Sequence, residues 1–381
     1  MDFSWTNEQL SYKKAVITFA QKQLNQNIIE RDHLNIFSGE LWKKCAEFGI
    51  QGLPFPEKYG GSDADILTAM LTMEGLGYGC CDNGLIFGIN AQMWSVQMPI
   101  FAFGSDVQKE KYLPRLCSGQ LIGAHGMTEP DSGSDAYALR TKADRRDGGY
   151  VLNGTKMFVT NAPVADLAVV FATLNPAIGM WGVTGFIVEK GTPGFTIGQE
   201  IRKMGLRTSP MGELVFQDCF LPEENRLGPE GAGATIFNHS MEWERSCILA
   251  SHLGAMERQL EKSIEYARER KQFGHSIGKY QSVANRIVDM KIRLETARLL
   301  LYKVAWLKKM GESAVMEAAM AKLYLSECFV QSGMDAIRTL GGYGYMTGVE
   351  VERDLRDAIG GVIYSGTSDI QRNIIARLLG L

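Results

Sequence analysis

The spacing of apolar residues changes twice along the chain, and each change marks a new kind of structural element. In the first part, a capping-box pattern at Thr6 and Gln9 precedes apolar positions at helical spacing: Leu10, Ala15, Val16, Phe19, Ala20 and Leu24. Further helices are predicted over 39–48, 65–75 and 107–116, with turn residues between them. This part of the chain is therefore predicted to be helical.

From about residue 121 the elements become short and rich in residues that favour strands. Glycine, proline, asparagine and aspartate separate six such runs, at 150–153, 156–160, 167–173, 183–189, 195–200 and 213–218. This arrangement is typical of a small antiparallel barrel or sandwich.

Long helical periods return at about residue 232, with helices predicted over 234–269, 281–310, 312–339 and 368–379. The order of elements predicts an α+β protein of three parts. These are an N-terminal helical domain (1–120), a middle β-barrel domain (121–231) and a C-terminal four-helix bundle (232–381).

Composition excludes several classes of protein. The chain has 381 residues, of which 45% are hydrophobic and 22% charged, and its net charge of −3 gives no reason to expect nucleic acid or an anionic membrane as partner. No apolar run reaches the roughly 18–20 residues that span a bilayer. Seven cysteines without a CxxC pair, and no secretory leader, predict reduced thiols in a cytoplasmic protein. Five scattered histidines predict no metal site.

Two segments of the middle region have side chains suited to a planar or phosphorylated ligand. The segment 127–135, Met-Thr-Glu-Pro-Asp-Ser-Gly-Ser-Asp, is a hydroxyl-rich turn that can hydrogen bond a ring edge or a phosphate, although plain polar loops look the same. The segment 154–161 predicts a strand that presents Phe158 and Thr160 to one face, where an aromatic side chain commonly packs in a core.

Two further stretches lie in the C-terminal part: 268–274, and 340–344 together with 364–372. The segment 268–274, Arg-Glu-Arg-Lys-Gln-Phe-Gly, places Arg270 at a charged helix end. In 340–344 a glycine pair permits close approach of a ligand to the backbone. In 364–372, Gly-Thr-Ser-Asp opens the last helix, whose N-terminus can cap itself and also receive a phosphate.

Taken together and in this order, the four stretches resemble the acyl-CoA dehydrogenase family across essentially the whole chain. The resemblance implies a homotetrameric flavoprotein with FAD between the β domain and the C-terminal helices, and it implies that Arg270 reaches the FAD of a neighbouring subunit. The cofactor-binding positions it implies are Met127, Thr128, Gly133, Ser134, Phe158, Val159, Thr160, Arg270, Phe273, Gln281, Arg338, Gly341, Gly342, Thr367, Ser368 and Asp369. Arg338 departs from the family, which usually has glutamine there.

The resemblance also implies a reaction, the oxidation of an acyl thioester between Cα and Cβ. A base removes the α-proton while N5 of the flavin accepts a hydride from Cβ. Many members supply the base as glutamate in a Tyr-Glu-Gly-Thr motif. Here that motif reads Tyr364-Ser365-Gly366-Thr367. Serine has no useful basicity at neutral pH, so another residue must be the base, while Ser365 still offers a backbone N–H to the thioester oxygen.

Glu244 is the predicted replacement. At 100° per residue, Phe237, Met241 and Ile248 lie within about 60° of Glu244 on the helix surface. A lone carboxylate on an apolar stripe is unfavourable unless it is paired or functional. From the residues alone, a salt bridge to Arg245 or to a neighbouring helix remains open. The resemblance favours the base, because the isovaleryl-CoA and long-chain branches carry theirs in a similar Glu-Arg context, and burial should raise its pKa.

Within the family, the chain is similar to the prolyl-carrier-protein dehydrogenases and oxidases of secondary metabolism, of the anatoxin-pathway type. That similarity implies a prolyl-loaded carrier protein as partner and a pyrroline or pyrrole thioester as product. Trp94 is predicted to shorten the acyl cavity. The substrate-binding positions are Ser134, Arg245, Met93, Trp94, Tyr364 and Ser365.

The sequence leaves two alternative functions open. One is a short-chain or branched-chain acyl-CoA dehydrogenase that passes electrons to an electron-transfer flavoprotein. The other is a flavin monooxygenase, or a non-catalytic homologue, on the same fold. The sequence leaves undecided whether two or four electrons are removed, whether oxygen reoxidises the flavin, and whether Arg338 contacts it.

Overall fold

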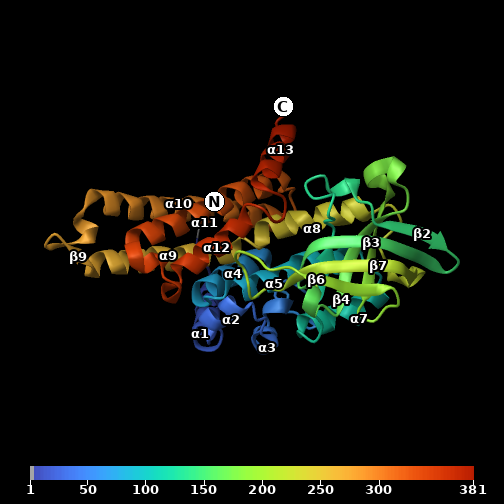
Figure 1. Cartoon of the computed structure of the whole chain (residues 1–381), viewed down its shortest axis with the longest axis horizontal. Helices are drawn as coiled ribbons and strands as arrows, with labels where there is room; N and C mark the ends of the chain where they lie inside the picture. Colours follow the sequence, from blue (N-terminus) through green and yellow to red (C-terminus); the bar gives the residue numbers. More distant parts are fainter. Residues whose placement is uncertain (1–3) are drawn as a thin grey trace.

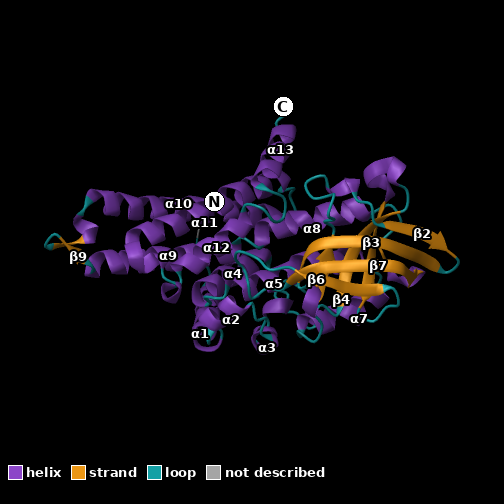
Figure 2. Ribbon diagram, in the orientation of Figure 1, coloured by secondary structure: helices purple, strands orange, loops and turns teal. Residues whose placement is uncertain are grey.

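A computed structural model describes residues 4–381, and its helices and strands occupy separate regions of an elongated molecule. The sheet lies at one end, the loop that contains β9 (Lys271–Gln272) lies at the other, and the N-terminal helices lie along one side near the middle (Figure 1). Figure 2 shows this segregation of strands from helices. The predicted α+β architecture is confirmed.

The N-terminal region begins with the predicted capping box. Gln9 donates its backbone N–H to Thr6 Oγ1 at 3.2 Å, and the Gln9 side chain accepts from the Thr6 backbone at 3.1 Å. The helices are α1 (Asn7–Gln23), α2 (Ile28–Leu34), α3 (Gly39–Glu47), α4 (Ile66–Gly79), α5 (Asn83–Gln92), α6 (Met98–Phe103) and α7 (Asp106–Cys117).

One continuous helical stretch in this region was not predicted. It runs through α5, a π-helical turn at Met93–Gln97 and α6. Its residues from 83 to 100 are almost all buried, so it has no polar face and hence no amphipathic period to detect. The short helix α2 was also missed.

The middle region forms an eight-stranded, mostly antiparallel sheet with strand order β6-β7-β3-β2-β4-β5-β8, to which β1 adds by pairing in parallel with β4. Its strands are β1 (Gly123–Gly126), β2 (Lys142–Arg146), β3 (Gly149–Thr160), β4 (Leu167–Thr173), β5 (Val183–Glu189), β6 (Phe195–Glu200), β7 (Met211–Pro222) and β8 (Arg226–Leu227).

The core of this sheet has two sides. Leu167, Val169 and Phe171 of β4 pack with residues of α6, α7 and α8 (Gly233–Cys247), whereas Ala168 and Val170 pack with residues of the sheet itself. The side chains that pack with Ala168 and Val170 come from β3, β4, β5 and β7, so the sheet curves over its own face as in a barrel.

Two runs that were predicted to be separate strands form a single strand. The runs at 150–153 and 156–160 both belong to β3, which carries register shifts between Leu152 and Gly154 and between Lys156 and Val159. Such bulges bend a strand and redirect side chains, which explains why the sequence looked interrupted. Strands β1, β2 and β8 were not predicted; β2 has charged residues at most positions and β8 has only two residues.

The C-terminal region contains α8 (Gly233–Cys247), α9 (Ala250–Glu269), α10 (Gln281–Lys309), α11 (Val315–Leu340), α12 (Val351–Gly361) and α13 (Ser368–Leu378). The predicted single helix over 234–269 is wrong, because it divides at Ile248-Leu249. Ser246 and Ser251 beside the break donate their hydroxyls to carbonyls of the preceding turn, which bends helices. Helix α12 was missed, and α13 projects from the body (Figure 1).

A buried ion pair attaches the 127–135 turn to the sheet. Lys156, fully buried on β3, donates to Glu129 Oε1 at 2.7 Å and to the Met127 carbonyl at 3.1 Å. Glu129 also accepts from the backbone N–H groups of Arg140 and Thr141, at 2.6 and 2.9 Å. The carboxylate is thereby neutralised and fully hydrogen-bonded, so the turn has one position against β3.

No helix among residues 4–381 combines the length and the apolar character that a membrane crossing requires. Within the same residues, no group of histidine, cysteine and acidic side chains is placed to bind a metal ion.

The ion pair gives a stability prediction. Glu129→Gln should lower the free energy of unfolding by about 3–5 kcal/mol, because it leaves the buried Lys156 ammonium without a counter-charge. The double variant Glu129→Gln/Lys156→Met should recover much of that loss. Urea denaturation followed by tryptophan fluorescence measures both. The exposed pair of Glu40 and Lys44 supplies the control, since Glu40→Gln should leave the stability close to that of the wild type. The prediction would be contradicted if Glu40→Gln and Glu129→Gln lowered the free energy of unfolding equally.

Candidate active site

Glu244 lies on α8 with its carboxylate buried between two serine hydroxyls. Ser365 Oγ donates to Oε1 at 2.5 Å, and Ser95 Oγ, from the π-helical turn, donates to Oε2. The Glu244 side chain is 9% exposed. Within residues 4–381 it forms no salt bridge, neither with Arg245 nor with a cation of a neighbouring helix. The structure therefore gives it hydroxyl partners where the sequence had left an ion pair open.

The electrostatic surroundings of Glu244 favour a poised carboxyl group. Burial raises the pKa of Glu244, while the hydrogen bonds from Ser365 and Ser95 and the charges of Arg245 and Lys322 lower it. The net shift of the pKa is upward, because lost hydration outweighs the partners. A carboxyl group with such a pKa is a better proton acceptor than an exposed one.

The turn at Ser365 is held in a strained backbone conformation. Its φ of 55° lies in the left-handed region, which is unfavourable for serine. Arg245 Nε donates to the Ser365 carbonyl at 3.1 Å, and Gln371 Nε2 donates to the Ser365 and Gly366 carbonyls at 3.2 and 2.9 Å. These contacts bring α8, the 364–367 turn and α13 together and compensate for the strain.

Tyr364 continues the same wall of the site. Its hydroxyl is 2.9 Å from His252 Nε2, and its ring centroid is 4.7 Å from that of Phe87. Lys322 Nζ lies 5.9 Å from the tyrosine ring and donates to the Gly361 carbonyl at 2.7 Å. Burial lowers the pKa of Lys322 to about 7 and that of His252 to about 3, so His252 is neutral at physiological pH.

Trp94 and Met93, predicted to contact the substrate, are both fully buried next to Ser95. The Trp94 indole is stacked on Trp243, with centroids 6.0 Å apart and 5° between the planes. Its N–H donates to Asn90 Oδ1 at 2.9 Å. The indoles therefore fill the space beside the carboxylate.

The sequence-based set lacked several residues that contact Glu244 or Tyr364, and three of them are polar: Ser95, His252 and Lys322. The argument that found Glu244 could have found Lys322, since it stands among the buried Ala318, Ala321 and Leu325 of α11. Ser95 and His252 give no comparable signal, because their partners come from elements far away in the sequence.

The predicted cofactor-binding residues of the middle region lie on neighbouring segments. The Met157 N–H donates to the Thr128 carbonyl at 2.8 Å, which places the 127–135 turn beside β3. Phe158 sits at the bulge with a φ of 57° and is 53% exposed, whereas Val159 is buried. Gly133 and Ser134 are exposed. An outward-facing phenylalanine beside a polar turn leaves an apolar surface that a planar ring can cover.

At the start of α13, Thr367 Oγ1 accepts from the Ile370 N–H at 3.2 Å, so the helix caps itself as predicted. The Ser368 hydroxyl is buried and has no partner among the described residues. A buried hydroxyl without a partner is unfavourable unless a ligand completes it, so this position fits a phosphate or another polar group. Asp369 is exposed.

The remaining predicted cofactor residues lie at the opposite end of the molecule. Arg270 and Phe273 belong to the loop after α9, near Gln281 at the start of α10, and Phe273 is 91% exposed. The glycine pair 341–342 is nearby, since the rings of Tyr266 and Tyr343 are 6.3 Å apart. Figure 1 places this loop, labelled β9, far from the sheet.

Within one chain, the predicted cofactor residues of the middle region and α13 lie far from those of the loop after α9. Helix α9 has 20 residues and separates them by about 30 Å at 1.5 Å per residue. Arg338, which departs from the family's glutamine, lies within 3.7 Å of Asp335.

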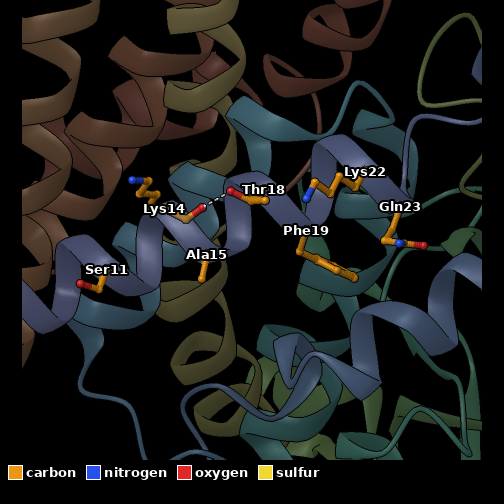
Figure 3. A pocket seen from close by; sticks show the side chains of 7 residues that line it. All are labelled: Ser11, Lys14, Ala15, Thr18, Phe19, Lys22 and Gln23. Atoms are coloured by element: carbon orange, nitrogen blue, oxygen red, sulfur yellow. Dashed lines mark hydrogen bonds between the residues drawn. The ribbon is translucent and has the colours of Figure 1, made fainter.

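A hollow of about 560 Å³ lies elsewhere, along the outer face of α1 (Figure 3). The residues that line it are Ser11, Lys14, Ala15, Thr18, Phe19, Lys22 and Gln23. Thr18 donates its hydroxyl to the carbonyl of Lys14 at 2.9 Å, so it is already satisfied. The exposed Lys14 and Lys22 are the titratable side chains among its lining residues.

Comparison with known proteins agrees with the geometry. The N-terminal, middle and C-terminal domain models of acyl-CoA dehydrogenase match residues 6–120, 124–219 and 231–380. An L-prolyl-[peptidyl-carrier protein] dehydrogenase of Serratia sp. (strain ATCC 39006) is 45% identical over 381 residues, covering 100% of this chain and 99% of the relative. The acyl-CoA dehydrogenase of Bacillus subtilis (strain 168) is 41% identical, covering 98% of each.

Solved structures are equally similar. The crystal structure of the prolyl acyl carrier protein oxidase AnaB has a TM-score of 0.98 and 53% identity, covering 99% of this chain and 100% of that one. The structure described as PigA with FAD and proline has a TM-score of 0.98 and 45% identity, covering 100% of both chains. The three matching domains and these relatives show that the chain belongs to the acyl-CoA dehydrogenase family.

Proposed function

We propose that the chain is an FAD-dependent dehydrogenase that oxidises an acyl thioester between Cα and Cβ, with L-prolyl on a carrier protein as its substrate. The observation that carries this proposal is the Glu244 carboxylate. It is buried, has no cationic partner within residues 4–381, and is held beside Ser365, the position at which many family members carry their base.

The residues present fit FAD. Phe158 offers an exposed ring at a bulge, and the Ser368 hydroxyl lacks a partner at the start of α13. When bound, FAD supplies the acceptor for the hydride from Cβ. The residues that would hold it on one subunit are Met127, Thr128, Gly133, Ser134, Phe158, Val159, Thr160, Thr367, Ser368 and Asp369.

Glu244 removes the α-proton of the thioester. Because its pKa is raised, the difference between the pKa of Glu244 and that of the weakly acidic α-carbon is smaller. The buried setting also excludes water that would compete for the proton. The backbone N–H of Ser365 donates to no other group among the described residues, so it is available to the thioester oxygen, where negative charge develops. Arg245 keeps that N–H in place through the Ser365 carbonyl.

The prolyl group as substrate is supported by the relatives, which include a prolyl-carrier-protein dehydrogenase and a prolyl acyl carrier protein oxidase. It is also supported by the space that Met93, Trp94 and Trp243 fill beside Glu244, which leaves less room for a long acyl chain. Loss of hydrogens from Cα and Cβ of the ring gives an enamine that isomerises to a pyrroline, and a second oxidation gives a pyrrole.

The active protein is a homotetramer in this proposal, and each FAD site is completed by a neighbouring subunit. The separation of the two groups of cofactor residues in one chain supports this. The projecting α13 also supports it, since it ends in the exposed Leu378, Leu379 and Leu381. The neighbouring subunit would contribute Arg270, Phe273, Gln281, Arg338, Gly341 and Gly342. The seven unpaired cysteines support a cytoplasmic location.

Glu244→Gln should bind FAD normally and lower the rate of thioester oxidation by at least about 100-fold, because glutamine cannot accept the α-proton. The protein should remain yellow, and flavin absorbance at equal protein concentration measures retention. Glu242→Gln is the matched control, since Glu242 lies on the same helix and pairs with Lys308 instead. In the wild type, kcat/KM should rise with pH through the raised pKa of Glu244 and then level off. Full activity of Glu244→Gln would refute its assignment as base.

Mass spectrometry should identify the substrate. Incubation with prolyl-loaded carrier protein should lower the mass of the loaded prolyl group by about 2 or about 4 units, for removal of two or four hydrogens. Butyryl-CoA and isovaleryl-CoA should react far more slowly under the same conditions. Faster oxidation of a CoA ester would replace the proposal by an acyl-CoA dehydrogenase. Peroxide released during turnover would show that oxygen reoxidises the flavin.

Mixed assemblies test the shared site. Glu244→Gln and Arg270→Ala chains, co-expressed with different tags and purified through both, should be more active than either variant alone. Each mixed interface can combine an intact Glu244 with an intact Arg270 of the neighbouring subunit. A mixture of Glu244→Gln with Glu244→Gln/Arg270→Ala is the control, because it contains no functional base. Activity of the mixture no higher than that of either parent would contradict a site built from two subunits.

A further inference from the structure

The π-helical turn at Met93–Gln97 lies beside Glu244. It interrupts a helix that otherwise runs from α5 into α6, and all five of its residues are buried. A π-helical turn widens the helix and changes the direction of the following side chains, and such turns occur often at functional sites. Ser95, at its centre, is 2% exposed and donates to Glu244 Oε2.

Two adjacent contacts join this turn to α8. Trp94 stacks on Trp243, and the next residues along each segment, Ser95 and Glu244, are hydrogen-bonded. Both indoles are fixed from outside the stack: the Trp94 N–H donates to Asn90, as described above. The Trp243 N–H points to His239 Nε2 at 3.3 Å, and Lys308 Nζ lies 4.2 Å from the Trp243 ring. The stack therefore sets the register of the π-helical turn against α8.

We propose that Ser95 is a positioning residue for the base, and that its hydroxyl and that of Ser365 form a two-point clamp on the Glu244 carboxylate. This inference rests on the proposed function of Glu244. The clamp comes from three elements far apart in the sequence, the π-helical turn, α8 and the turn before α13. Each carboxylate oxygen receives one donated hydrogen bond, so the group cannot rotate, and each oxygen keeps a lone pair for the substrate proton.

The clamp also balances the burial of the carboxylate. A hydrogen bond donated to an ionised carboxylate stabilises that form, and Ser365 and Ser95 both act in this direction on the pKa of Glu244. The charged side chains that act on the carboxylate, Arg245 on α8 and Lys322 on α11, lower its pKa as well. Removal of one hydroxyl leaves a buried oxygen without a partner, so less of the base is ionised at neutral pH.

The test uses the FAD-loaded enzyme and the pH dependence of flavin reduction in a single turnover with prolyl-loaded carrier protein. Ser95→Ala should shift the acid limb of the rate to higher pH by about one unit, so that flavin reduction is about tenfold slower at pH values on that limb. Its KM and flavin absorption spectrum should stay close to those of the wild type. Ser95→Thr and Ser95→Val have the same shape and differ in the hydroxyl, so Thr should restore the profile and Val should not.

Ser263→Ala is the matched control, since Ser263 is a fully buried serine whose hydroxyl donates to a carbonyl of its own helix α9. It should leave the pH profile unchanged. An unaltered profile in Ser95→Ala, or equal profiles in the Thr and Val variants, would overturn the clamp while leaving Glu244 as the base. Full activity of Glu244→Gln would instead overturn the proposed function itself.

Discussion

The central constraint on this structure is the burial of the Glu244 carboxylate, which has no counter-ion within 4.0 Å among residues 4–381. Removing an ionised group from water is strongly unfavourable, and most of the other buried acidic side chains, such as Glu74 and Asp82, are paired with arginine or lysine. Glu244 instead receives two serine hydroxyls, which satisfy its oxygens but leave its charge unneutralised. A neutralised carboxylate would be a weak base, whereas one held by neutral donors keeps a raised pKa and can accept a proton.

The architecture around Glu244 follows from the need to supply these donors. Ser95 reaches the carboxylate because a π-helical turn faces α8 at the register set by the Trp94–Trp243 stack. Ser365 reaches it from a left-handed backbone position held by Arg245 and Gln371. Local strain is thus concentrated around the reacting group and compensated by hydrogen bonds from its neighbours.

The elongated shape has a parallel consequence for the cofactor. Phe158 lies on β3 of the sheet and Ser368 lies three residues after Ser365, the partner of Glu244, while Arg270 and Phe273 lie beyond the far end of α9. A helix of this length is rigid, so the two groups cannot close on one ligand within a chain. The long bundle that stabilises the fold is therefore also what makes a neighbouring subunit necessary in the proposed assembly.

The sequence by itself determined the helical, β and helical order of the three regions, the capping box at Thr6, and the placement of Glu244 on an apolar face, because these depend on local periodicity. It did not reveal the stretch around Ser95 or the continuity of β3, since a helix buried on all sides has no period and a bulge shifts the alternation of a strand. Only the tertiary structure decided which partners Glu244 has. Hydroxyls 149 and 121 residues away in the chain meet it, and a contact between such distant positions leaves no mark on the spacing of either.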